Sequence, residues 1–190
     1  MIEISFTFGM ILITCLWLTV RAFIWFRQKR VDVKRELQLL LVYICLMVVA
    51  RFTFYPFGKV DGKIQPLLLD PDLIFPFNTN FVPAVYLFDY PTVKEALINL
   101  IGNTAMFLPL GIVWPVVFKE LNTHGKAIAA GVGVSFTIEL LQLPFFSRVS
   151  DVDDLLLNSI GYLVGYGILL LVRLVKREKH KRLTGNPFQM

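Results

Sequence analysis

The chain has 190 residues, of which 56% are hydrophobic, and its mean hydropathy is +0.65. A soluble globular domain carries less apolar content, so this composition excludes that class. The net charge is +5, yet Lys and Arg cluster at the ends of apolar runs and no nucleic-acid-binding motif is present. This pattern is typical of a membrane protein and argues against a nucleic-acid partner.

Five segments have the length and apolarity of transmembrane helices. The first of them is preceded by Glu3 rather than by positive charge, so we interpret it as a retained helix and not as a signal peptide. The sequence therefore predicts an all-α, multi-pass membrane protein with five transmembrane helices. These helices are expected at residues 4–26, 37–55, 96–118, 127–146 and 152–175.

The distribution of Lys and Arg predicts the orientation of the chain, because basic connections stay in the cytoplasm. Five basic residues lie in the stretch 27–35, two lie at 119 and 126, and six lie in 173–182. We therefore expect the N-terminus outside and the C-terminus in the cytoplasm. The predicted organisation is two N-terminal helices (1–55), an extracytoplasmic loop (56–95), a three-helix region (96–175) and a basic cytoplasmic tail (176–190).

The predicted outer loop, residues 56–95, is rich in proline and in aromatic residues. It holds six prolines, which exclude one long helix, and three lysines against five acids. A flexible linker would be more polar. We expect the loop to pack on the outer membrane surface or to fold back over the helices, as lids and binding loops do.

Several polar residues lie inside the apolar segments. A helix rises about 1.5 Å per residue, which places Glu139, Asn158 and Asn103 about 10 Å below the outer ends of three different helices. Arg51 lies near the outer end of the second. Ionisable groups inside a membrane are costly and are therefore functional candidates. A carboxyl at the depth of Glu139 must be neutral, paired or solvated in a cavity.

These polar residues also share helix faces, because residues three or four apart lie side by side on a helix. Asn99 lies on the face of Asn103, and Gln142 lies on the face of Glu139. In the fifth helix a pair of small residues continues the polar stripe and would allow another helix to approach closely. The sequence thus predicts a polar cleft open to the outside. The stripe is Asp151, Asp154, Asn158, Gly161 and Gly165.

The candidate site residues fall into three groups. The carboxyls of Glu139 and Asp154 are the candidates for catalysis. Asp151 and Asp154 are also weak candidates for holding Mg²⁺, and no other cofactor is indicated. The candidates for ligand binding are Arg148, Asn158, Asn103, Gln142, Asp151, Asn99 and Arg51.

Structural roles are open for several of these residues. Arg51 could reach the outer headgroups, and the two asparagines of the third helix could hydrogen-bond a neighbouring helix. Asp151 could cap the fifth helix. Glu139 could form a purely structural ion pair with Arg148 or Arg51.

Three blocks of the sequence together resemble the VanZ-like family of bacterial membrane proteins. They are Leu-Ile-Phe-Pro-Phe-Asn-Thr at 73–79, Asn-Leu-Ile-Gly-Asn-Thr-Ala-Met-Phe-Leu-Pro-Leu-Gly at 99–111, and the stretch 139–165 with its polar stripe. The resemblance implies a multi-pass protein of the bacterial plasma membrane, linked to teicoplanin resistance through less antibiotic reaching the cell surface.

Three classes of function stay open at this stage. The favoured one is a protein that binds a lipid headgroup or lipid-linked envelope precursor in the cleft, with Arg148 holding a phosphate. The second is an enzyme on the same lipids, with Glu139 as acid or base. The third is a proton-coupled transporter using Glu139, for which the absence of an inverted repeat would call for a homodimer.

Overall fold

The computed structural model describes residues 1–55, 59–74, 79–80, 82, 92–121, 123–146 and 148–184. These residues form five α-helices, one short 3₁₀ helix (η1, Pro71–Ile74) and six short strands. The helices are α1 Phe6–Gln28, α2 Val33–Phe54, α3 Val93–Val117, α4 His124–Gln142 and α5 Val152–Thr184. The strands are β1 Ile2–Ile4, β2 Lys59–Val60, β3 Lys63–Ile64, β4 Leu67–Leu69, β5 Thr79–Asn80 and β6 Ser150–Asp151.

Polar caps explain where four of the helices begin. The side chains of Ser5, Asp32, Thr92 and Thr123 each accept a hydrogen bond from a backbone N–H in the first turn of the helix that follows. Such a bond satisfies one of the backbone donors that a helix start leaves unpaired. The second, third and fourth helices consequently start three or four residues before the apolar stretches that predicted them.

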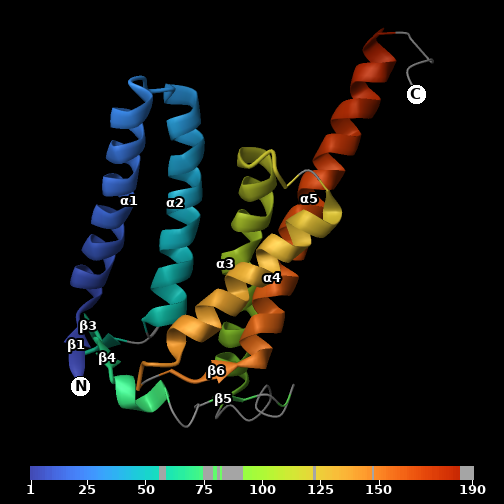
Figure 1. The fold of residues 1–190 in the computed structure, drawn as a ribbon. Helices are drawn as coiled ribbons and strands as arrows, with labels where there is room; N and C mark the ends of the chain where they lie inside the picture. Colours follow the sequence, from blue (N-terminus) through green and yellow to red (C-terminus); the bar gives the residue numbers. More distant parts are fainter. Residues whose placement is uncertain are drawn as a thin grey trace.

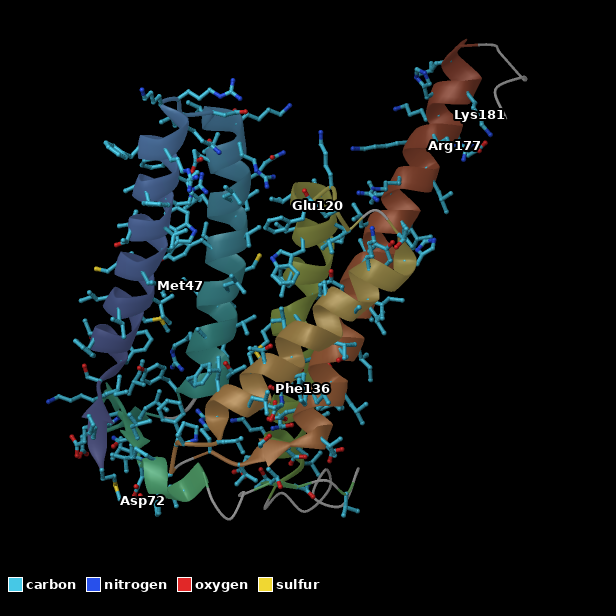
Figure 2. The ribbon with its side chains drawn as sticks, viewed as in Figure 1. Met47, Asp72, Glu120, Phe136, Arg177 and Lys181 are labelled. Atoms are coloured by element: carbon cyan, nitrogen blue, oxygen red, sulfur yellow. The ribbon has the colours of Figure 1, made fainter. Side chains whose placement is uncertain are left out.

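The N-terminus and all six strands lie at one end of the helical bundle, which we call the strand end (Figure 1). The turn between α1 and α2 and the C-terminal part of α5 lie at the opposite end (Figure 1). Asp72 is at the strand end, whereas Glu120, Arg177 and Lys181 lie toward the other end (Figure 2). The orientation of the chain in the membrane stays a prediction from the distribution of Lys and Arg.

Four of the five helices, α1, α2, α3 and α5, are long and apolar enough to cross a membrane. The prediction of five helices is confirmed. Among the described residues, however, α4, which was expected as the fourth transmembrane span, is not one of the helices that are long and apolar enough to cross a membrane. It starts with a histidine and a lysine, ends at Gln142 rather than at residue 146, and carries Glu139 within it. α4 runs obliquely across α3 and α5 and returns the chain to the strand end (Figure 1).

The fifth helix is longer than the sequence indicated. It continues nine residues beyond the expected end at 175, through the basic segment, as far as Thr184. The residues described in the predicted tail are therefore helical.

The tightest packing in the bundle joins α3 to α5. A Cβ added to Gly161 would lie 2.0 Å from the Thr104 carbonyl oxygen, and one added to Gly165 would lie 2.0 Å from that of Leu108. The backbones of the two helices therefore touch, which confirms the close approach predicted from the small-residue pair. Phe107, Leu110 and Tyr162 fill the buried core around this contact.

At the strand end, short pairings join the predicted loop to the helices. β4 pairs antiparallel with β1, so that Leu67 lies opposite Ile4, and Leu69 forms a bridge with Phe145 in the α4–α5 connection. β5 pairs in parallel with β6. The described parts of 56–95 thus contact both the N-terminus and the α4–α5 connection.

Candidate functional site

A cavity of about 250 Å³ lies at the strand end of the bundle, between the ends of four helices. α2 contributes Phe52 and Thr53 to its lining. Seven of the nine residues predicted from the sequence also line it. They are Asn99, Asn103, Glu139, Gln142, Arg148, Asp154 and Asn158.

The wall between α3 and α5 is held by amide and carboxyl groups. Asn103 donates a hydrogen bond from Nδ2 to Asp154 Oδ1, and its Nδ2 also lies 3.5 Å from Asn99 Oδ1. The predicted face shared by the two asparagines is therefore directed toward the fifth helix. The hydrogen bond from Asn103 to Asp154 also joins α3 to α5, which is the structural role that the sequence left open for the asparagines.

Glu139 is buried, with 5% of its surface exposed. Its Oε2 accepts a hydrogen bond of 2.9 Å from the backbone N–H of Asp151, at the point where the chain enters α5. No described ion pair joins Glu139 to Arg148. The carboxyl therefore fixes the start of α5 while still lining the cavity.

Gln142 and Arg148 both reach the C-terminal end of α2. Gln142 Nε2 donates to the Thr53 carbonyl oxygen at 2.8 Å, and Arg148 Nε donates to that of Phe54 at 3.1 Å. The last carbonyls of a helix have no partner within the helix, so these bonds satisfy them. Burial lowers the pKa of the Arg148 guanidinium, and the nearby Asp154 carboxylate opposes that shift.

Four buried polar atoms in the cavity lining have no hydrogen-bond partner among the described residues. They are Nδ2 and Oδ1 of Asn158, Oε1 of Gln142 and one guanidinium nitrogen, Nη2, of Arg148. Asn158 is only 1% exposed. An unsatisfied buried polar group is costly, and these four belong to residues that line one cavity.

Two predicted residues do not line the cavity. Asp151 Oδ1 accepts hydrogen bonds from the Asp153 N–H at 2.9 Å and from Asn80 Nδ2 at 3.2 Å. It therefore acts as the cap of α5 rather than as a ligand of the cavity. Arg51 lies over the rings of Phe6 and Phe52 and donates to the Tyr55 carbonyl oxygen, so its described contacts are with the ends of α1 and α2.

Within the described part of the chain, no group of three or more His, Cys, Asp or Glu residues could hold a metal ion. Asp154 faces the cavity while Asp151 caps the helix, so the proposed Mg²⁺ pair is divided between two environments. The Mg²⁺ assignment to these two residues stays a prediction.

Some lining residues were not predicted from the sequence. Glu95 is exposed at the mouth of the cavity, and Ile98, Phe52 and Thr53 complete its wall. The spacing of Glu95, Asn99 and Asn103, each four residues from the next, could have revealed Glu95. Thr53 contributes a backbone carbonyl, for which the sequence carries no signal.

A family model described as VanZ/LLP1 matches residues 39–173, a range that includes every residue lining the cavity. The chain belongs to the VanZ/LLP1 family. It is 32% identical over 91 residues to the uncharacterised membrane protein YwnJ of Bacillus subtilis, covering 48% of this chain and 62% of YwnJ. It is 28% identical over 107 residues to Protein VanZ of Enterococcus faecium, covering 45% of this chain and 66% of that protein.

The resemblance to VanZ-like proteins drawn from the sequence is thereby confirmed. The matches span slightly less than two thirds of each relative's own length. No solved structure matches the chain. The VanZ/LLP1 region leaves out α1 and the first turns of α2, and residues 75–78 of the first motif block lie outside the described residues.

Proposed function

We propose that this VanZ-type protein resides in the bacterial plasma membrane and binds the headgroup of a lipid or lipid-linked envelope precursor in its cavity. Binding there would lower the access of a lipoglycopeptide such as teicoplanin to the cell surface. The observation that carries this proposal is the cavity lined by unsatisfied buried polar atoms of Asn158, Gln142 and Arg148.

The size and place of the cavity support a headgroup as its ligand. Its volume is slightly below the about 300–1,000 Å³ of pockets that enclose drug-sized molecules. A headgroup would fit, whereas a whole lipid-linked precursor would extend beyond it. The cavity lies at the strand end, which the charge distribution predicts to face the outside, where a lipoglycopeptide acts.

The test is the binding of a fluorescent teicoplanin-type lipoglycopeptide to bacteria that express the wild-type chain or Glu139→Gln at matched membrane levels. Glutamine can still accept the hydrogen bond from the Asp151 N–H, so the variant changes charge with little change in packing. We expect the wild type to lower surface binding and Glu139→Gln to lose that effect. Asp72→Asn, an exposed acid at the same end, is the matched control and should behave as the wild type.

If the wild type leaves the surface binding of the lipoglycopeptide unchanged, the protein does not have the proposed activity. If Glu139→Gln lowers that binding as much as the wild type does, the activity does not depend on the cavity.

An enzyme acting on a phospho- or glycolipid is the second candidate, because two carboxyls, those of Glu139 and Asp154, line the same cavity. One would act as acid or base during cleavage or transfer at the headgroup. Lipid analysis of the same cells distinguishes the two candidates. An enzyme would deplete one lipid in wild-type cells and not in Glu139→Gln cells, whereas a binding protein would leave the lipid composition unchanged.

A proton-coupled transporter is the weakest candidate. The cavity residues lie at the strand end, and the buried core beside them is formed by apolar and aromatic side chains such as Phe107 and Leu110. A transporter needs polar groups through the whole bundle.

A further inference from the structure

The charges of the cavity point to the chemistry of its ligand. Among the described residues that line it, three carry a carboxyl, Glu95, Glu139 and Asp154, and one carries a guanidinium, Arg148. The Arg51 guanidinium lies outside the lining but close enough to act electrostatically on Arg148, so the carboxyls near the cavity still outnumber the cations. Carboxylates gathered in one cavity repel one another, and a bound cation relieves that repulsion. A purely anionic headgroup would meet an excess of like charge.

The carboxyls are placed so that they can accept further hydrogen bonds. Asp154 Oδ1 accepts a hydrogen bond from Asn103, and Glu139 accepts from the Asp151 backbone N–H and from the Ser150 side chain. A carboxylate offers about four lone-pair sites, and an ammonium group brings three donors and no acceptor. The cavity therefore has acceptors for an ammonium group on the side of α4 and α5.

One anionic group of a ligand can bind next to these carboxyls, at Arg148. The Arg148 guanidinium keeps one buried nitrogen, Nη2, without a partner among the described residues. Asp154 lies close enough to act electrostatically on Arg148, so the cationic and anionic parts of the lining are neighbours. Asn158, with both amide atoms unsatisfied, can donate to an anion and accept from an ammonium group.

A shallow apolar groove continues from the cavity along α3. It has a volume of about 540 Å³ and shares Ile98 with the cavity lining. Leu97 and Ile101 form its apolar surface, and both are exposed. A molecule whose headgroup occupies the cavity can therefore lay a hydrocarbon chain along this groove without leaving the protein surface.

From this arrangement we infer that the cavity selects a zwitterionic lipid headgroup, in which a primary ammonium group meets the carboxyls and an adjacent phosphate meets Arg148. This inference rests on the proposed function and names the class of lipid that serves it. Phosphatidylethanolamine is the simplest lipid with this chemistry.

The experiment uses the full chain in detergent and measures the binding of short-chain lipids by native mass spectrometry. Three lipids share the same acyl chains: phosphatidylethanolamine, its N-acetyl derivative, which lacks the ammonium charge, and phosphatidylglycerol. Free phosphoethanolamine is a fourth probe, which separates a lipid ligand from a soluble one. A charge-assisted hydrogen bond corresponds to about tenfold in affinity, so we expect phosphatidylethanolamine to bind about tenfold more tightly than the other two lipids.

Two variants test whether Asp154 is responsible for the preference for phosphatidylethanolamine. Asp154→Asn keeps an oxygen that can accept from Asn103, and it should bring the affinity ratio between phosphatidylethanolamine and its N-acetyl derivative toward one. Asp72→Asn should keep the wild-type ratio. Size-exclusion profiles show that each variant is folded.

Equal binding of the three lipids, or an unchanged ratio in Asp154→Asn, overturns the inference while the proposed lipid-binding function stands. Binding of free phosphoethanolamine as tightly as the lipid also overturns it, because the groove would then contribute nothing. If no lipid binds and lipoglycopeptide binding to cells is unaffected, the proposed function fails as well.

Discussion

Asn158 is the most deeply buried polar side chain in the cavity lining. Its two amide atoms have no partner among the described residues, whereas Gln142 holds the Thr53 carbonyl oxygen. Two amides of similar burial in the same cavity thus differ in how much of their hydrogen bonding the protein itself uses. Gln142 therefore supports the end of α2 and still has Oε1 unpaired among the described residues, whereas Asn158 has no described side-chain hydrogen bond.

We predict opposite effects of two substitutions on the stability of the purified protein. Asn158→Leu removes a group that the described structure leaves unsatisfied, so the free energy of unfolding should stay near the wild-type value or rise. Gln142→Leu leaves the Thr53 carbonyl oxygen buried without a partner and should cost about 1–3 kcal/mol. Thermal unfolding in detergent measures both, and both variants should lose the effect on lipoglycopeptide binding.

A loss of stability in Asn158→Leu as large as that in Gln142→Leu would contradict this prediction. It would show that Asn158 supports the fold.

The two candidate residues that do not line the cavity share a physical reason. Asp151 belongs to the polar stripe of α5 by spacing, but it stands at the first turn, where capping the helix competes with facing the cavity. Arg51 has the right depth, yet aromatic rings at the ends of α1 and α2 hold its guanidinium. Depth and spacing predict the level and the face of a residue, but not which local partner its side chain takes.

At the scale of helices, the sequence predicts α3 and the start of α5 well, because their apolar runs are long and their polar residues recur at helical spacing. It ends α5 nine residues too early, because the last turns are basic rather than apolar. It places the end of α4 four residues too late. Backbone contacts decide this end: the Phe146 N–H donates to the Leu68 carbonyl oxygen, and Pro144 accepts from the Asp70 N–H. Strands of two or three residues, such as β1 and β4, are too short to leave a periodic signal.

The close contact of α3 with α5 gives a prediction for these helices. Gly161→Ala places a methyl group against the Thr104 carbonyl, which is backbone and cannot move aside, so we expect a loss of at least about 1–3 kcal/mol of stability. Gly167→Ala is the matched control, because nothing lies within 4 Å of its added Cβ. It should be neutral or stabilising by up to about 1 kcal/mol.

Thermal unfolding of the two alanine variants beside the wild type provides the measurement. Equal stability of Gly161→Ala and Gly167→Ala would mean that the helices do not touch at this point.

At the scale of the whole molecule, the orientation in the membrane is a prediction from charge and from the arrangement of the bundle. In a chain whose own cysteines are replaced (Cys15→Ala and Cys45→Ala), Asp72→Cys and Glu178→Cys each add one exposed thiol at opposite ends. A membrane-impermeant maleimide should label position 72 in intact cells and position 178 only after the cells are opened. Labelling of both positions from the same side would show that α4 does not carry the chain across the membrane.

The backbone contact between α3 and α5 also determines which part of the cavity can change shape. Because the backbones of α3 and α5 touch and Asn103 is hydrogen-bonded to Asp154, we expect the wall that carries these two residues to be the more rigid one. The opposite wall is held by single side-chain bonds from Gln142 and Arg148 to the end of α2. Apart from these bonds, the edge-to-face contact of Phe54 with Phe145 joins the α4–α5 connection to α2. We therefore expect any opening of the cavity to occur at this wall, between α2 and the α4–α5 connection, and not between α3 and α5.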